Sequence, residues 1–212
     1  MTPRAASSLE REAAAWAERR LLVGVDEVGR GPLAGPVVAA AAVFPARCTP
    51  VPGVRDSKTL SAPQRVALAA ALRDTALAVG LGAASRHEID RLNIRVATAL
   101  AMRRALCRAL RRLDAPSCTI VVDGLPVPEL GYLHESLVDG DALCYSIAAA
   151  GILAKTVRDR LMVRLAQRHP RYDWDRNMGY GTPSHLDAIS RHGPTPHHRR
   201  SFAPVSQLGL GV

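Results

Sequence analysis

The segment that most constrains the fold is LLVGVDEVGRGPLAG, residues 21–35, an apolar run that ends in two adjacent acidic residues. Its branched aliphatic side chains predict a buried strand over Leu21 to Val25. Asp26 and Glu27 come next. Because successive residues of a strand point to opposite faces, both carboxylates can serve one site only if the backbone turns locally.

The glycines that follow Asp26 and Glu27 help to decide whether the two carboxylates form a binding site. Gly29 and Gly31 flank Arg30, and together they could supply the turn and let a ligand approach the main chain closely. Removing two adjacent carboxylates from water costs free energy unless a positive charge lies beside them. A solvated acidic turn is the simpler interpretation of Asp-Glu alone, but Asp-Glu followed at once by GRGP favours a site for metal and phosphate.

Two further carboxylates follow predicted strands. Asp123 comes directly after the apolar run Cys118 to Val122, and Asp141 comes after a weaker strand candidate, Leu133 to Val138. Strands that end at one edge of a sheet would bring these groups to the first pair. Four such carboxylates cannot all stay ionised without cations, and hard oxygen ligands select Mg²⁺ or Mn²⁺. Judged by spacing alone, unrelated solvated turns remain the simpler interpretation.

Composition narrows the class of partner. The formal charge of +9 and a pI near 10.2 indicate a polyanion, nucleic acid before membrane, although a GC-rich genome explains the arginine content equally well. Hydrophobic residues make up 48% of the chain, which predicts a globular protein without a membrane-length run. The scattered cysteines predict free thiols in a reducing cytosol rather than a zinc site; they are Cys48, Cys107, Cys118 and Cys144.

The remaining pattern alternates strands and helices in one domain without internal repeats. We expect helices over Ser8 to Arg20, Ala62 to Val79 (ended by Gly80), Ile89 to Leu113, Ala142 to Gln167 and Ser184 to His192. We expect the remaining strands over Pro36 to Phe44, which follows the first strand as an antiparallel hairpin, and Leu81 to Ser85. Asp114 to Pro116 should stop the third helix, and His169 to Pro183 should be a functional loop.

The motifs, taken together, resemble those of type 2 ribonuclease H. They are VDEVGRGPLAGPVVAAA, DSKTLS, VDG, DGD, ILAKTVRDRLM, GYGT and GPTPHHRRSFAPV, in the family's order from about Leu21 to Val205. The resemblance implies an α/β ribonuclease H-like fold, a five-stranded mixed sheet flanked by helices. It also implies a helical lead over residues 1–20 and one catalytic domain over 21–212, with a C-terminal helical extension from about residue 168.

The same resemblance implies an activity. It predicts a metal-dependent endonuclease that cleaves RNA paired with DNA and the 5′ side of ribonucleotides embedded in duplex DNA, leaving 5′-phosphate and 3′-hydroxyl ends. Two divalent cations, Mg²⁺ or Mn²⁺, would be its cofactors and nucleic acid its partner, with no membrane. A monomer in the bacterial cytoplasm is the default expectation.

Site residues carry over position by position. The family's four acids fall on Asp26, Glu27, Asp123 and Asp141, its ribose-sensing motif on Gly29, Arg30 and Gly31, and its junction-sensing tyrosine on Tyr180. Main-chain groups exposed by glycines can hydrogen-bond the 2′-hydroxyl that distinguishes RNA, and a tyrosine can stack on a sugar or base.

Other polar residues admit two interpretations. Lys58 is expected to contact a backbone phosphate, whereas Lys155 and Arg158 suit either phosphate contacts or structural roles on a helix face. Asp159 is expected to hold a helix or pair with arginine rather than bind metal. The pair His197-His198 is expected to form hydrogen bonds or contact phosphate, since adjacent residues seldom share one metal.

The chain departs from the family pattern at four positions. Asp139 replaces a lysine, Gly151 a serine, Met178 a lysine and Leu125 a residue that is often asparagine. All four acids are present, so the departures affect the expected phosphate contacts rather than the expected reaction.

Two other functions fit parts of the sequence. Gly29-x-Gly31-x-x-Ala34 after a strand matches a dinucleotide-binding turn, but that motif must open a helix, and Pro36 to Phe44 predicts a strand. A non-catalytic nucleic-acid-binding module would explain the positive charge. Such a module gains nothing from acids clustered against a polyanion.

Overall fold

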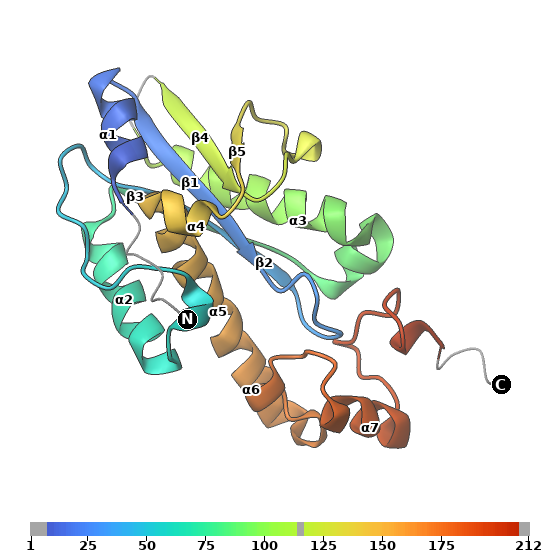
Figure 1. The fold of residues 1–212 in the computed structure, drawn as a ribbon. Helices are drawn as coiled ribbons and strands as arrows, with labels where there is room; N and C mark the ends of the chain where they lie inside the picture. Colours follow the sequence, from blue (N-terminus) through green and yellow to red (C-terminus); the bar gives the residue numbers. More distant parts are fainter. Residues whose placement is uncertain (1–7, 114–116, 208–212) are drawn as a thin grey trace.

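The computed structural model describes residues 8–113 and 117–207, which form a five-stranded mixed sheet with helices on both faces (Figure 1). The strands are β1 (Leu21–Val28), β2 (Val37–Val43), β3 (Ala78–Ala84), β4 (Cys118–Asp123) and β5 (Glu135–Leu137), in the order β3-β2-β1-β4-β5. β1 pairs antiparallel with β2 and parallel with β4. The predicted fold class and hairpin are therefore confirmed.

Seven α-helices lie within the described residues. They are α1 (Glu10–Ala17), α2 (Ala62–Thr75), α3 (Arg86–Leu110), α4 (Gly140–Leu143), α5 (Tyr145–Arg168), α6 (Trp174–Asn177) and α7 (Pro183–His192). Local sequence explains where α2 and α3 begin. Ser61 with Gln64, and Ser85 with Glu88, form capping boxes that satisfy the first backbone N–H groups of each helix.

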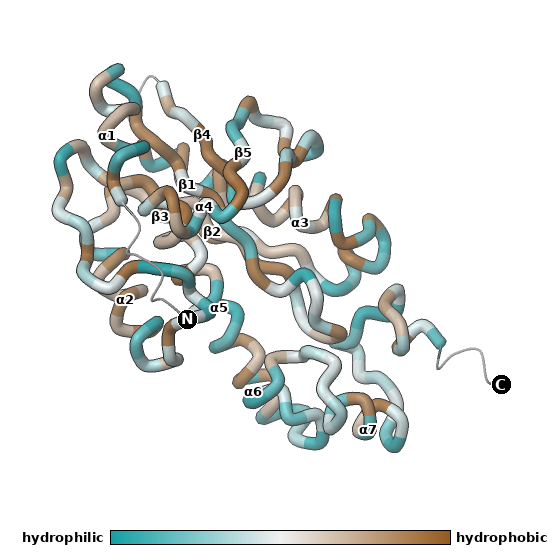
Figure 2. The backbone as a smooth tube through the Cα atoms, viewed as in Figure 1, coloured by the Kyte–Doolittle hydropathy of each residue, from teal (hydrophilic) through white to brown (hydrophobic). Residues whose placement is uncertain are grey.

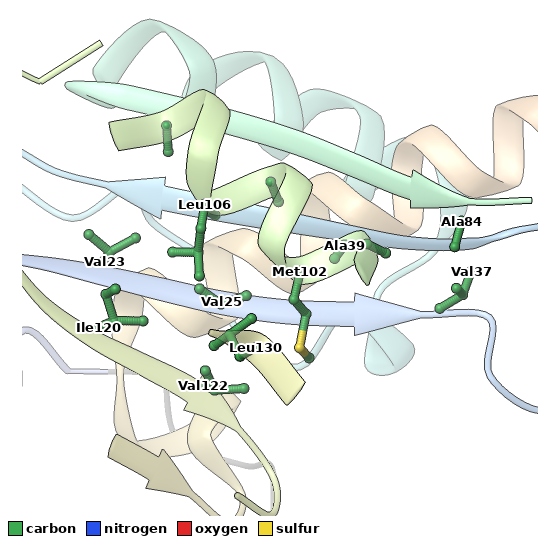
Figure 3. Close-up of a cluster of buried hydrophobic side chains, with 14 of the residues drawn as sticks. Val23, Val25, Val37, Ala39, Ala84, Met102, Leu106, Ile120, Val122 and Leu130 are labelled. Atoms are coloured by element: carbon green, nitrogen blue, oxygen red, sulfur yellow. The ribbon is translucent and has the colours of Figure 1, made fainter. Parts of the chain in front are cut away.

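The sheet has one hydrophobic core on each face. On one face, side chains from β1, β2 and β4 point toward Met102 and Leu106 of α3 (Figure 3). On the other face, α5 packs on β1 and β2 together with α2. Hydrophobic residues run along β1 and β4, as Figure 2 shows, because these central strands are covered on both sides.

Several predicted boundaries were wrong. The second predicted helix ends at Thr75 rather than Val79, and Gly80 lies inside β3, where a Cβ would meet the Ala105 carbonyl oxygen at 2.0 Å. The predicted helix from Ala142 is two helices, separated at Cys144, whose backbone is extended. The predicted stop at 114–116 lies outside the described residues.

The segment predicted as a functional loop, residues 169–183, is partly core. It contains α6, whose Trp174 is completely buried. Trp174 packs in a cluster with Tyr172 of the same segment and with Met162, which belongs to α5. In Figure 1 this cluster, with α7 and the chain that follows, lies beyond the end of the sheet where β1 gives way to β2. The C-terminal part is therefore a packed extension that borders this end.

The four cysteines are free thiols, as predicted. None of the helices within residues 8–113 and 117–207 has the length and apolar character needed to cross a membrane.

Candidate active site

The two adjacent acids remain inside β1. Asp26 pairs with Ala40 and Glu27 with Ala39 of β2, so the strand does not end at Val25 as predicted. Because the strand is regular there, the two side chains leave opposite faces of the sheet. The expected turn comes after them, at Gly29, whose φ is +92°.

Asp123 is the last residue of β4, and Asp26 lies in the neighbouring parallel strand β1. The last pair that joins β1 to β4 is Val25 with Val122, which places the two aspartates next to each other on one face. Asp26 Oδ1 accepts a hydrogen bond of 2.6 Å from the Glu27 N–H, and Asp123 Oδ1 accepts one of 2.9 Å from the Gly140 N–H. Each carboxylate is thus oriented through one oxygen.

Helix α5 passes close to Asp26 at a glycine. A Cβ on Gly151 would lie 2.4 Å from Asp26 Oδ2, so the space that the carboxylate occupies depends on the absence of a side chain there. The departure from serine at this position therefore has a direct steric consequence at the site.

The acids interact unfavourably with one another. Burial raises the pKa of Asp26 well above its usual value, and the negative charges of Glu27, Asp123 and Asp141 raise it further. Burial also raises the pKa of Glu27, against the effect of Arg30, and the pKa of Asp123. The structure thus brings the four predicted acids within electrostatic range, and we call them the carboxylate edge.

Their donor chemistry suits a hard divalent cation, since every ligand would be a carboxylate oxygen. Within the described residues, however, no three His, Cys, Asp or Glu side chains are grouped tightly enough to hold a metal ion. Burial and mutual repulsion are the conditions that a cation would relieve.

Two positive side chains border the carboxylate edge. Lys58, in a 3₁₀ turn that Asp56 caps, lowers the pKa of Asp123 through its charge. Arg30 Nη1 lies 3.3 Å from Glu27 Oε1, while most of the arginine side chain faces solvent. A cleft of about 360 Å³ is lined by residues that include Glu27, Arg30 and Asp123. Both cations are placed where they could meet a phosphate.

The two glycines around Arg30 have different surroundings. At Gly29, a Cβ would clash with the Arg158 side chain at 2.1 Å, and φ is positive. At Gly31, the nearest atom to a Cβ would be Tyr180 Cε1 at 3.7 Å, an ordinary contact. The fold therefore requires glycine at 29, whereas at 31 glycine leaves open surface beside a tyrosine ring. We call residues 29–31 the glycine loop.

Arg158 does not face solvent. It is fully buried, and its guanidinium donates to three carbonyl oxygens, those of Ala34, Pro36 and Met178. Of its two predicted roles, the structural one is correct. Lys155 and Arg65 both pair with Asp159, as expected for that aspartate.

Arg199 is the residue that sequence reasoning missed, since the sequence gives it no role beyond its place in the motif GPTPHHRRSFAPV. It is also fully buried, and it donates to the carbonyls of Gly29, Arg30 and Gly35. No local pattern could reveal this, because these acceptors lie 164–170 residues away in the chain. We call Arg158 and Arg199 the arginine clamp.

Two buried histidines, His185 and His198, connect the backbone at Tyr180 to the C-terminal segment. Trp174 Nε1 donates to His185 Nε2, so His185 is neutral and its Nδ1–H donates to the Tyr180 carbonyl at 2.8 Å. His198 Nδ1 accepts from the Thr195 N–H, which leaves its Nε2–H to donate to His185 Nε2 at 3.1 Å. The expectation that His198 forms hydrogen bonds is confirmed.

The dinucleotide-binding interpretation fails on geometry. The chain after the glycine loop enters β2, a strand, where that motif needs a helix whose N-terminus faces the pyrophosphate.

Comparisons with known proteins identify the family. The family model described as Ribonuclease HII matches residues 23–205. The chain is 51% identical to a ribonuclease HII of Synechococcus sp. (strain JA-3-3Ab), over 96% of this chain and 91% of that protein. It is 54% identical to one of Cereibacter sphaeroides (strain KD131), over 93% and 91%.

Solved structures show the same fold. The crystal structure of ribonuclease H2 from Pyrococcus horikoshii matches with a TM-score of 0.71 and 25% identity, over 90% of this chain and 97% of that one. A Bst ribonuclease HIII in complex with Mn²⁺ matches with a TM-score of 0.68, over 90% and 70%. At 20% identity, this second likeness supports the fold alone.

Proposed function

The chain belongs to the ribonuclease HII family and is an endoribonuclease, and from this premise we propose that it cleaves the 5′ side of ribonucleotides embedded in duplex DNA. RNA strands of RNA–DNA hybrids are the broader substrate class of the family. The products would carry 5′-phosphate and 3′-hydroxyl ends, and the enzyme would act as a cytoplasmic monomer.

The observation that carries the metal dependence is the partly buried carboxylate edge. Asp26 faces Asp123 across adjacent strands, and three neighbouring negative charges raise its pKa. Asp26, Glu27, Asp123 and Asp141 would hold two divalent cations, Mg²⁺ or Mn²⁺. Such ions activate a water and stabilise the leaving oxygen of a phosphodiester. The Gly140 N–H would hold Asp123 in a fixed orientation throughout.

Recognition would fall to the glycine loop and Tyr180. Main-chain N–H groups beside Gly31 would hydrogen-bond the 2′-hydroxyl, and the open surface there admits a sugar. Tyr180, 44% exposed, would stack on the nucleotide beyond the ribose, while Lys58 and Arg30 would contact phosphates.

The deciding experiment uses a DNA duplex that contains one ribonucleotide, incubated with and without Mg²⁺ or Mn²⁺. We expect one metal-dependent cut on the 5′ side of the ribonucleotide, with ends identified by mass spectrometry. The matched all-DNA duplex should stay intact. Cleavage in chelator, or a cut elsewhere, would contradict the proposal.

Tyr180→Ala separates junction sensing from general binding. We expect cleavage at a single ribonucleotide to fall about tenfold more than cleavage of a long RNA–DNA hybrid, because only the first substrate presents an obligatory RNA-to-DNA junction. Equal losses on both substrates would assign the tyrosine to general contact.

A further inference from the structure

Arg199 lies beneath the glycine loop and holds its backbone from inside. Its Nη2 donates to the Gly29 carbonyl at 2.5 Å and its Nη1 to the Arg30 carbonyl at 2.7 Å. Its Nε donates to the Gly35 carbonyl at 3.0 Å. The planar fork of one guanidinium therefore fixes both ends of the turn that joins β1 to β2.

These bonds determine where the loop's N–H groups point. A trans peptide is planar, and its C=O and N–H point in opposite directions. When Arg199 holds the carbonyls of Gly29 and Arg30 inward, the N–H groups of Arg30 and Gly31 must point away from the protein interior. Gly31 contributes no side chain to cover them, and the Tyr180 ring lies beside this surface.

The C-terminal segment fixes the guanidinium in turn. The Arg199 N–H donates to the Leu33 carbonyl at 2.8 Å, and the Gly35 N–H donates to the His197 carbonyl at 3.0 Å. The ring of Phe202 lies 5.1 Å from the guanidinium carbon. Among the described residues, the hydrogen bonds of the Arg199 side chain all go to carbonyl oxygens. A buried charge satisfied in this way has a fixed geometry, because its donors diverge at set angles.

We propose that Arg199 is a positioning residue for ribose selection, orienting the N–H groups of Arg30 and Gly31 toward the 2′-hydroxyl without touching the substrate. This inference rests on the proposed function and adds a residue to it. Lysine cannot replace the arginine, because one ammonium lacks the planar fork that reaches three carbonyls at once.

The test compares two constants in one assay. KM and kcat are measured on a duplex with one ribonucleotide, and the matched all-DNA duplex is added as a competitive inhibitor to give Ki. For Arg199→Lys we expect kcat/KM on the ribonucleotide duplex to fall about tenfold to a hundredfold, mainly through KM, while Ki for DNA stays unchanged. The ratio of Ki to KM therefore falls.

A purely structural role predicts a different result. A smaller folded fraction lowers the apparent kcat and leaves KM and Ki as they were, and that outcome overturns the proposal. Arg104→Lys is the matched control, because Arg104 also donates to a carbonyl, that of Ala83, but at the outer edge of the sheet. Its ratio of Ki to KM should equal that of the unsubstituted protein.

If Arg199→Lys does not fold, the ratio of Ki to KM is measured on the variant Phe202→Leu instead. It removes the ring beside the guanidinium and keeps the three hydrogen bonds, so a smaller fall in the same ratio is expected. An unchanged ratio in this variant overturns the proposal. If the unsubstituted protein does not cleave at the ribonucleotide at all, the proposed function fails, which is a separate result.

Discussion

At the carboxylate edge Asp26 lies half-buried near three other acids, whereas in the C-terminal part Arg199 lies fully buried against carbonyl oxygens that accept its hydrogen bonds. The first arrangement leaves negative charge only partly offset, by Lys58 and Arg30. The second arrangement places main-chain carbonyl dipoles against the positive charge, while burial and the neighbouring Arg158 still lower the pKa of Arg199 from 12.5 to about 9. On the proposed function, a bound cation would relieve the repulsion at the carboxylate edge, whereas the arginine clamp is held by the protein's own main chain.

The largest effect is expected at the carboxylate edge itself. Asp26→Asn should lower turnover on a ribonucleotide duplex by at least about a thousandfold, roughly 4 kcal/mol of barrier, because a cation ligand is lost. Duplex binding should persist, since removing negative charge cannot weaken attraction to phosphate. Chemical denaturation without divalent cations should show the variant to be more stable than the unsubstituted protein. Near-native turnover would remove Asp26 from the metal site.

The glycine loop allows a sharper comparison, between Gly29 and Gly31. Gly29→Ala should lower the free energy of unfolding by about 2–4 kcal/mol, because φ is positive and the methyl meets the Arg158 side chain. Gly31→Ala should change it by less than about 0.5 kcal/mol.

The effect of Gly31→Ala should appear in the rate of cleavage rather than in the free energy of unfolding. Gly31→Ala should reduce kcat/KM at a single ribonucleotide by about tenfold or more, because the methyl occupies the surface where the sugar would lie. Steady-state kinetics on the folded variant measures this. Full activity with unchanged stability would mean that the substrate does not approach Gly31.

The two regions should also respond to pH with opposite sign. The pKa of Asp26 is raised above the ordinary value of 3.8, so its ionisation destabilises the folded state, and this penalty disappears as pH falls toward 4. Burial, chiefly, and the neighbouring His185 lower the pKa of His198 from 6.5 to about 3. The folded state then resists protonation, so its stability falls as pH drops below 6.5 toward 3.

Two measurements separate these contributions. In metal-free buffer, the stability advantage of Asp26→Asn over the unsubstituted protein should shrink between pH 7 and pH 4. In a Trp16→Phe background, the emission of Trp174, which bonds His185, should stay constant between pH 7 and pH 4 and shift to the red only as the pH falls toward 3, where His198 becomes protonated. A shift in the opposite direction, or a constant advantage of the asparagine variant, would contradict the comparison.

The smallest effect is expected at Asp139, whose negative charge raises the pKa of Asp123. Asp139→Lys should lower KM for substrate and raise the Mg²⁺ or Mn²⁺ concentration for half-activity, each by about twofold to threefold. Asp139 has φ of +55°, a conformation that asparagine tolerates better than lysine, so Asp139→Asn is the control for strain. If neither constant moves, the side chain has no part in either equilibrium.

The sequence by itself determined the fold class, the hairpin and the family. Apolar runs ending in carboxylates predicted β1 and β4, and the motifs from Leu21 to Val205 are specific enough to predict the five-stranded sheet. A local signal also located the helix start after Ser61, because capping depends on residues three positions apart, whereas the third helix begins at Arg86, after the Ser85 cap, and not at Ile89 as predicted.

Only the tertiary structure decided how the candidate site is supported. Asp26 and Glu27 remain in a regular strand because β2 pairs with both of them, which a local sequence cannot reveal. Arg199 reaches carbonyls near the other end of the chain, and Gly31 differs from Gly29 in what packs beside it and in lacking a positive φ. Burial and long-range hydrogen bonds are properties of the folded chain, so residues of the same type acquire different roles there.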